Sequence, residues 1–306
     1  MACLFEVTVG SEEARFVPEA RGALDEVDAL EAVLTVFSES SELARVNRHA
    51  ASGPVAVSAG LMDLLALCRD LHRSTGGAFD PTSTPLSREW GFLGRQGRWP
   101  SPEEIEASRA RVGMERVALS ESERTVGFTS PGVELNLGSI GKGWALDRIA
   151  RILRARGLRR ALVNAGGSSF LGWGADHWNV SLSPVREPLA GLHLRRGALG
   201  TSGAGEQFFE VDGRRFGHVI DPRTGWPAAG VRSATVITVD AAISDALATA
   251  FVVGGGALAR AWCADHPGTL ALLVSEDEPR TLVAYGSREG VMVEPEPDVR
   301  VVSDEG

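Results

Sequence analysis

The stretch that decides the fold is VELNLGSIGKGWALDRIARILRARGLRRALVNAGGSSFLGWG, residues 133–174. It begins with a short apolar segment, Val133–Leu137, which predicts a strand, and continues into the glycine-rich turn Gly138–Gly143. Apolar residues at helical spacing then predict a helix that ends at Gly157, and a second strand and a second glycine turn follow. A strand, a glycine turn and a helix N-terminus in this order direct backbone N–H groups to one point, where a phosphate can bind.

The turn GSIGKG differs from the two common phosphate-binding motifs. A P-loop has four residues between its first glycine and its Gly-Lys pair, whereas this turn has two, and Gly143 follows the lysine instead of Ser or Thr. The dinucleotide fingerprint Gly-x-Gly-x-x-Gly has its glycines in another order. Lys142 is the only lysine in the chain, which hints at a purpose. The alternative that the glycines only make tight turns stays open.

Composition indicates a globular protein and excludes two classes of partner. The chain has 306 residues, of which 43% are hydrophobic and 23% are charged. The net charge of −9 argues against a general binder of nucleic acid or of acidic membranes. The three cysteines are far apart and form no CxxC pair, so free thiols in a reducing compartment are expected.

The N-terminus and the apolar runs bear on localisation. No run of apolar residues is long enough to predict a transmembrane segment, and no signal peptide is visible. Residues 4–9 instead predict a strand. The expectation is therefore a cytoplasmic protein, or an exported one if the sequence is a trimmed form.

The rest of the chain alternates helices and strands without a linker that would force a domain boundary. Helices are expected at residues 18–37, 59–74 and 102–111, and mostly strands after Gly174. In a later helix, 242–253, Asp245 and Thr249 lie four residues apart and so share a face. Their oxygens could hold Mg²⁺, or Thr249 could cap its own backbone. Residues 1–290 are predicted to form one domain, followed by an acidic, frayed tail at 291–306.

Five segments in this order resemble the FAD:protein FMN transferases of the ApbE type. The resemblance spans about residues 37–250, and each motif is specific only in combination with the others. The segments are Phe37-Ser38 with Ser41–Asn47; Gly77–Thr82 with Trp90–Phe92; Asn136–Gly143 with Val163–Gly167; Thr201–Gly203 with His218–Gly225; and Ser244–Ala250.

The resemblance implies a fold, a reaction and a set of site residues. The implied fold is α+β, a single T-fold-related domain of antiparallel sheets with packed helices. The implied reaction transfers FMN from FAD to a Ser or Thr hydroxyl of an acceptor flavoprotein, releases AMP and requires Mg²⁺. The implied metal ligands are Ser139, Asp245 and Thr249. The implied FAD contacts are Met1, Ala78, Phe79, Asp80, Asn136, Lys142, His218 and Ile220.

The chemistry of these residue types agrees with the implied reaction. Breaking a pyrophosphate requires neutralisation of its oxygens, which a hard cation and the Lys142 ammonium can supply. An attacking hydroxyl needs a proton acceptor, and His218, with an ordinary pKa of roughly 6.5, is the first candidate. The alternative for His218 is a histidine that only supports its turn. Asp221 is expected to organise the turn that contains Pro222.

Three departures from the family pattern leave other functions open. Asn136 stands where the family usually has Asp, Ala204-Gly205 replaces a common Asp-Tyr, and the segment after Phe37-Ser38 is short and lacks the usual aromatic residue. A Mg²⁺-dependent FAD pyrophosphatase and a non-catalytic FAD-binding protein are therefore the alternative functions. A serine hydrolase is poorly supported, because the sequence around Ser202 lacks the last glycine of Gly-x-Ser-x-Gly.

Overall fold

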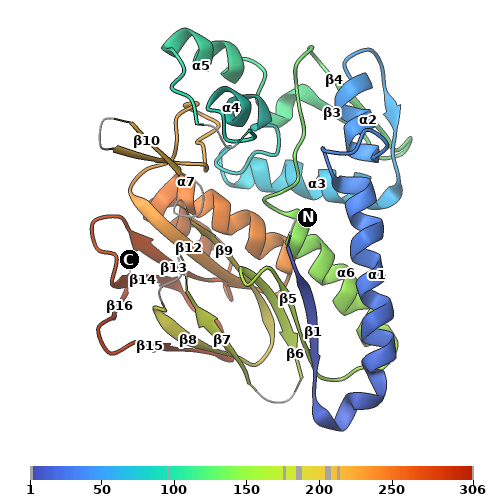
Figure 1. Cartoon of the computed structure of the whole chain (residues 1–306). Helices are drawn as coiled ribbons and strands as arrows, with labels where there is room; N and C mark the ends of the chain where they lie inside the picture. Colours follow the sequence, from blue (N-terminus) through green and yellow to red (C-terminus); the bar gives the residue numbers. More distant parts are fainter. Residues whose placement is uncertain are drawn as a thin grey trace. The chain divides into compact units, whose positions relative to one another are not determined.

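The computed structural model describes residues 3–94, 97–174, 177–183, 188–203, 208–211 and 214–304. Its helices pack against mainly antiparallel sheets, which confirms the predicted α+β class (Figure 1). The chain divides into two compact units. Unit 1 comprises residues 1–29, 140–205 and 229–306, and unit 2 comprises residues 30–139 and 206–228.

Unit 1 is built on an eight-stranded sheet and a smaller three-stranded sheet. In spatial order the large sheet contains β1 (Phe5–Val9), β5 (Ala161–Ala165), β6 (Ser169–Trp173), β9 (Gly197–Gly203), β12 (Val231–Thr238), β13 (Leu270–Ser275), β14 (Thr281–Gly286) and β16 (Arg300–Ser303). The small sheet contains β15 (Val291–Pro295), β8 (Ala190–Leu194) and β7 (Trp178–Leu182). All strand pairs are antiparallel except β14 with β16.

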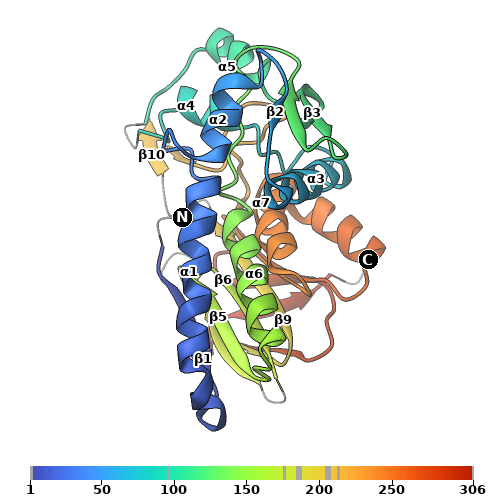
Figure 2. The same cartoon turned by 90° about the vertical axis from the view of Figure 1, so that its right-hand side faces the viewer.

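Apolar side chains lie on both faces of the large sheet. On one face, residues such as Val163 and Leu171 pack with α1 (Val17–Leu34) and α6 (Gly141–Ala155), which run side by side in Figure 2. On the other face, residues such as Leu199 and Leu272 pack with the small sheet. The central strands β9, β12 and β13 are therefore buried at consecutive positions instead of at every second one.

The helices α6 and α7 (Ala241–Asp265) cross closely within unit 1. A Cβ atom on Gly143 would lie 2.1 Å from the carbonyl oxygen of Ala241, so only glycine fits at this crossing. Asp147 of α6 accepts hydrogen bonds of 2.9 Å from the amides of Ala241 and Ala242, and so caps the N-terminus of α7. Burial raises the pKa of Asp147 to about 6, although these two amides act in the opposite direction.

The helix α7 is long and apolar because it is a core helix. Its backbone is kinked at Gly255, where φ is +65° and ψ is −165°. The helix predicted at residues 242–253 corresponds to the part before this kink, and the second part continues to Asp265. In the described part of the chain, α7 alone has the length and hydropathy that a membrane span needs, but 56% of that window is buried inside the protein.

Unit 2 contains four short α-helices and two small sheets. The helices are α2 (Glu42–His49), α3 (Ala59–Ser74), α4 (Thr84–Glu89) and α5 (Pro102–Arg109). The sheets are β2 (Val55–Ala56) with β4 (Thr125–Phe128) and β3 (Val117–Ser120), and the hairpin of β10 (Phe208–Val211) and β11 (Arg214–Gly217). Helix α3 occupies the predicted range, and its start at Ser58 follows from the side-chain cap that Ser58 gives to the Leu61 amide.

Two sequence-based predictions need correction. Val133–Leu137 forms no strand, although Val133, Leu135 and Leu137 are buried in alternation. The side chain of Asn47 accepts from the Leu135 amide and donates to the Leu135 carbonyl, at 2.8 and 2.9 Å, and so replaces a neighbouring strand.

The predicted frayed tail is the second correction. Residues 291–295 and 300–303 form β15 and β16, which pair with β8 and β14. Val291 and Val293 pack on the core between the sheets, and this apolar contact orders a segment that its acidic composition had suggested would fray.

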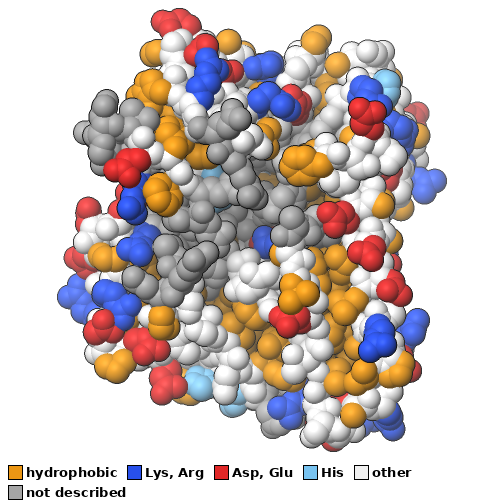
Figure 3. Space-filling view, viewed as in Figure 1, with side chains coloured by type: hydrophobic (Ala, Val, Ile, Leu, Met, Phe, Trp, Pro, Cys, Tyr) orange, Lys and Arg blue, Asp and Glu red, His pale blue; other side chains and the backbone are white. Residues whose placement is uncertain are grey.

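The surface is mixed in charge. On the face drawn in Figure 3, Lys and Arg side chains lie among Asp and Glu side chains.

Candidate functional site

The candidate metal residue Asp245 lies near the start of α7 in unit 1, with its side chain only 3% exposed. The Lys142 ammonium lies 3.0 Å from Oδ1 and 3.3 Å from Oδ2 of the carboxylate. The Gly143 amide donates to Oδ2 at 3.1 Å, and the Ser169 hydroxyl donates to Oδ1 at 3.0 Å. The structure therefore joins the glycine turn to the late helix through a single buried carboxylate.

These donors use the acceptor capacity of the carboxylate. An ionised carboxylate has about four lone-pair sites, and two hydrogen bonds reach each oxygen of Asp245 when Lys142 is counted on both. The buried negative charge is matched by one ammonium, as buried charges generally require. A cation that bound Asp245 would therefore take the place of the Lys142 ammonium, because the backbone amide and the buried serine have less freedom to move.

Thr249 follows Asp245 by one turn of α7 and shares its face. Its hydroxyl is hydrogen-bonded to the hydroxyl of Ser202 on β9, with 2.9 Å between the oxygens. A carboxylate and a hydroxyl one turn apart fit the preference of Mg²⁺ for oxygen ligands. The described residues contain no group of three His, Cys, Asp or Glu that could hold a metal, so further ligands would be hydroxyl, backbone or substrate oxygens.

The predicted FAD-binding segment Ala78–Asp80 lies in a tight loop of unit 2. Gly76 and Gly77 have φ values of +58° and +78°, which favour glycine, and they turn the chain at the end of α3. The Phe79 amide donates to the Thr75 hydroxyl at 3.1 Å. Ala78 and Phe79 are each 1% exposed as whole residues, so they belong to the core. Asp80 is 7% exposed as a whole residue but only 2% in its side chain, so its backbone is what this segment can offer to a ligand.

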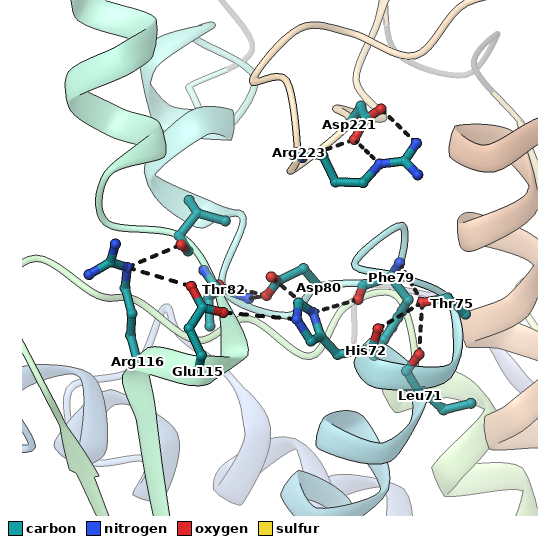
Figure 4. A network of polar contacts seen from close by, with 12 residues as sticks. Leu71, His72, Thr75, Phe79, Asp80, Thr82, Glu115, Arg116, Asp221 and Arg223 are labelled. Atoms are coloured by element: carbon teal, nitrogen blue, oxygen red, sulfur yellow. Dashed lines mark hydrogen bonds and ion pairs between the residues drawn. The ribbon is translucent and has the colours of Figure 1, made fainter.

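The carboxylate of Asp80 points into the protein and organises this loop (Figure 4). Its Oδ1 accepts from the Thr82 amide at 2.8 Å and from the Thr82 hydroxyl at 2.6 Å. The Thr82 hydroxyl in turn accepts from the Gly113 amide at 2.7 Å. The other oxygen, Oδ2, lies 3.2 Å from Nδ1 of His72 on α3. Asp80 is thus tied directly to its own loop and to α3, and through Thr82 to the chain at Gly113.

Two further predicted residues lie just before α6. The Asn136 side chain accepts from the Gly138 amide at 2.9 Å, and the Asn136 amide donates to the Pro81 carbonyl at 2.8 Å. Asn136 thereby shapes the glycine turn and links it to the loop that contains Asp80. Ser139 lies half-buried in that turn and is the last residue of this part of unit 2.

The segment His218–Ile220 leaves β11 and enters a turn of unit 2. His218 is half-buried with its ring 6.5 Å from that of Phe92, while Val219 and Ile220 are buried. Asp221 accepts from the Arg223 amide at 2.9 Å and forms two further hydrogen bonds with the Arg223 guanidinium at 2.8 Å. Asp221 therefore organises its turn, as expected.

A cavity of about 460 Å³ opens in unit 2 beside the loop. His72 and Asp80 line it together with Glu115, Arg116 and Arg223 (Figure 4). Acidic and basic groups are nearly balanced in its lining, so it presents no strong net charge to a ligand.

The predicted site residues are thus distributed over both units. Lys142, Asp245 and Thr249 belong to unit 1, whereas Ala78–Asp80, Asn136, Ser139, His218 and Ile220 belong to unit 2. Met1, Ala204 and Gly205 lie outside the described residues. The sequence analysis missed Ser169, Ser202 and His72. The one sequence signal that could have identified Ser169 is its position at the start of the apolar run SSFLGW. Nothing in the helical spacing of residues 59–74 distinguishes His72 from its neighbours.

Comparison with known proteins places the chain in a family. The model of the ApbE family matches residues 1–274. The FAD:protein FMN transferase of Treponema pallidum is 33% identical over 285 residues, which cover 85% of this chain and 79% of the relative. The enzyme of the same name from Escherichia coli K12 is 30% identical over 243 residues, which cover 75% and 69%.

Solved structures agree with the sequence comparison. The ApbE protein of Thermotoga maritima is 30% identical and superposes with a TM-score of 0.81 over 96% of both chains. The flavin transferase ApbE of Vibrio cholerae is 26% identical, with a TM-score of 0.73 over 97% of this chain and 95% of that one. The chain belongs to the ApbE family, as the resemblance of its motifs predicted.

Proposed function

We propose that this protein transfers FMN from FAD to a Ser or Thr hydroxyl of an acceptor flavoprotein, releases AMP and uses Mg²⁺. Support comes from membership of a family whose relatives carry the name FAD:protein FMN transferase. The single structural observation that carries the proposal is the buried Asp245 carboxylate with the Lys142 ammonium 3.0 Å away. A carboxylate, a hydroxyl and an ammonium are the groups that a diphosphate and its cation require.

The proposed roles follow from the side chains. Mg²⁺, when bound through Asp245, Thr249 and Ser139, would neutralise charge on the pyrophosphate of FAD. Lys142, once released from Asp245, would donate hydrogen bonds to phosphate oxygens. The backbone of Ala78–Asp80 would position the cofactor.

The chemical step forms one bond and breaks one. The acceptor hydroxyl oxygen attacks the phosphorus of the FMN half, the bond from that phosphorus to the bridging oxygen breaks, and AMP leaves with the bridging oxygen. The hydroxyl proton goes to the imidazole of His218, which we assign as general base. Water in place of the acceptor hydroxyl would give FMN and AMP, the pyrophosphatase reaction.

The test incubates the protein with FAD, Mg²⁺ and a candidate acceptor flavoprotein. Intact-mass analysis of the acceptor and chromatography of AMP give both products. Equal amounts of flavinylated acceptor and AMP support the proposal. AMP with free FMN and an unmodified acceptor indicates the pyrophosphatase, and bound FAD without AMP indicates the non-catalytic alternative.

Asp245→Asn tests the assignment of the carboxylate. We expect transfer to fall by about a hundredfold or more, since electrostatic stabilisation of the reacting phosphate is lost. Asp265→Asn is the matched control, because Asp265 is an exposed residue at the end of the same helix. Full activity of Asp245→Asn at limiting Mg²⁺ would contradict the assignment.

A further inference from the structure

The loop Gly76–Thr82 is held from within by side chains that a ligand cannot reach. The Asp80 side chain is 2% exposed, and Phe79 is 1% exposed. Asp80 as a whole residue is 7% exposed, more than its side chain, so a cofactor at Ala78–Asp80 meets chiefly the backbone of Asp80. Its affinity therefore depends on the conformation of that backbone. The groups that set this conformation are consequently determinants of cofactor binding, although they do not touch the cofactor.

The side chain of His72 ties this loop to helix α3. Its Nδ1 lies 3.2 Å from the Phe79 carbonyl oxygen and 3.2 Å from Asp80 Oδ2 (Figure 4). Its Nε2 lies 3.9 Å from Glu115 Oε2. Nδ1 thus makes both contacts with the loop, and Nε2 faces a second carboxylate at ion-pair distance. An imidazole that carries two protons bears the positive charge that these two carboxylates favour.

The protonation of His72 follows from its surroundings. The hydrogen bond to Asp80 raises the pKa of His72 above its usual 6.5, and the Phe79 carbonyl and the charges of Asp80 and Glu115 act in the same direction against burial. Arg223 faces the imidazole across Gly77, since a Cβ atom there would lie 3.5 Å from His72 and 3.6 Å from Arg223. The other charged groups that line the same cavity are Glu106, Arg109 and Arg116.

Beneath the loop lies the Cys68 thiol, also on α3. Burial, and secondly the charge of Asp80, raise the pKa of Cys68, so this thiol stays neutral. It therefore adds no negative charge beside the imidazolium. His72 is 22% exposed to the cavity, through which it can exchange its proton with solvent.

We propose that His72 is a positioning residue for cofactor binding, which holds Ala78–Asp80 in the binding conformation while its imidazole carries both protons. This inference rests on the proposed function, because it takes FAD as the ligand of that segment. It makes the affinity for FAD dependent on pH: loss of the second proton removes the positive charge that faces Asp80 and Glu115. The contact between Nδ1 and the loop is then no longer charge-assisted, which loosens the loop and weakens binding.

The first experiment measures the dissociation constant of FAD by flavin fluorescence between pH 5.5 and 8.5. Wild-type affinity should fall as the pH rises through the pKa of His72. His72→Ala should bind FAD roughly tenfold more weakly at pH 6, the worth of a hydrogen bond to a charged group, and its affinity should not change with pH. His72→Asn keeps a neutral donor near Nδ1 and should recover part of the affinity, again without pH dependence.

The matched control is His49→Ala, since His49 is an exposed histidine at the end of α2 in the same unit. It should retain the wild-type profile. Wild-type affinity in His72→Ala at pH 6, or the same pH dependence in both proteins, would overturn the inference. Circular dichroism of each variant shows whether it is folded.

A second measurement needs no FAD. The His72 ring is titrated by NMR in the wild type and in Asp80→Asn, where the pKa should fall because the hydrogen-bond acceptor has lost its charge. If the wild type binds no FAD but this pKa shift is present, the proposed function fails, whereas the contact between His72 and Asp80 is supported. If His72 titrates near 6.5 in both proteins, the inference fails whatever happens with FAD.

Discussion

At the scale of single residues, the feature that matters is a buried carboxylate whose position is fixed by donors from two other elements. Asp245 comes from α7, Lys142 and Gly143 from the start of α6, and Ser169 from the start of β6. Each donor satisfies a lone pair that would otherwise be costly to bury. The orientation of the carboxylate is thereby set before any ligand arrives.

Ser169→Ala tests how much this orientation contributes. The change removes a 3.0 Å hydrogen bond to Asp245 from a serine that is fully buried. We expect the affinity for Mg²⁺, measured by calorimetry in the presence of FAD, to fall by roughly tenfold, since hydrogen bonds to charged groups are worth about 1.5–3 kcal/mol.

Ser108→Ala is the control for this prediction. Ser108 is also fully buried and donates to a carboxylate, that of Glu89, at 3.1 Å in unit 2. Its loss should lower stability by a comparable amount and leave Mg²⁺ affinity unchanged. Equal Mg²⁺ affinity in Ser169→Ala and the wild type would show that Lys142 and Gly143 are sufficient to orient the Asp245 carboxylate.

Motifs were predictable from the sequence, but the residues that support them were not. Asp245 and Thr249 share a face because of helical spacing alone, and the resemblance placed Lys142 in the same site. Ser169 and His72 act through partners that are distant in the sequence or on another element, 76 residues away in the case of Ser169. No local pattern reports such a contact.

At the scale of elements, the crossing of α6 and α7 explains why residue 143 is a glycine. The sequence analysis had considered this glycine only as part of a turn that can bind a phosphate. Gly143 faces the Ala241 carbonyl so closely that a methyl group cannot fit. Its own amide binds Asp245. Gly143 is therefore required by helix packing and by the site together.

Replacing Gly143 by Ala should lower the free energy of unfolding by several kcal/mol, because the helices must separate to accept the methyl group. Chemical denaturation measures this change. Gly22→Ala is the matched control: Gly22 lies in α1 with nothing within 4 Å of its added Cβ. That variant should gain up to about 1 kcal/mol from the better helix propensity of alanine. Equal stability of the two variants would refute the close crossing.

The prediction of element types was best where the apolar pattern was long, and it failed where side chains replaced a sheet partner. Helix α3 and strand β12 follow from periodicity and β-branched composition. Val133–Leu137 has the burial of a strand, but the amide of Asn47 satisfies its backbone. The tail forms β15 and β16 because of apolar packing that its acidic composition concealed.

At the scale of the whole molecule, the three cysteines remain free thiols, in agreement with the sequence analysis. Cys68 and Cys263 are buried, whereas Cys3 is half-buried. Burial raises the pKa of Cys263 to about 11 and also raises that of Cys68. Since the thiolate is the reactive form, these two thiols should be inert in the folded protein.

Thiol labelling at pH 8 checks this expectation. Cys3 should react in the folded protein, whereas Cys68 and Cys263 should react only after denaturation. Cys3→Ser should then show no rapid reaction in the folded state. Rapid labelling of Cys68 or Cys263 in that variant would mean that the core around them opens readily.

The cap that Asp147 gives to α7 couples the folding of the first turn of α7 to the docking of α7 on α6. Asp147 precedes Ala241 by 94 residues, so α7 gains its two N-terminal hydrogen bonds only after a long loop has closed. The first turn of α7 therefore matures no earlier than its docking on α6. Native-state hydrogen exchange should find the Ala241 and Ala242 amides opening in the same cooperative step as the amides of α6, and an earlier opening would show that the turn frays alone.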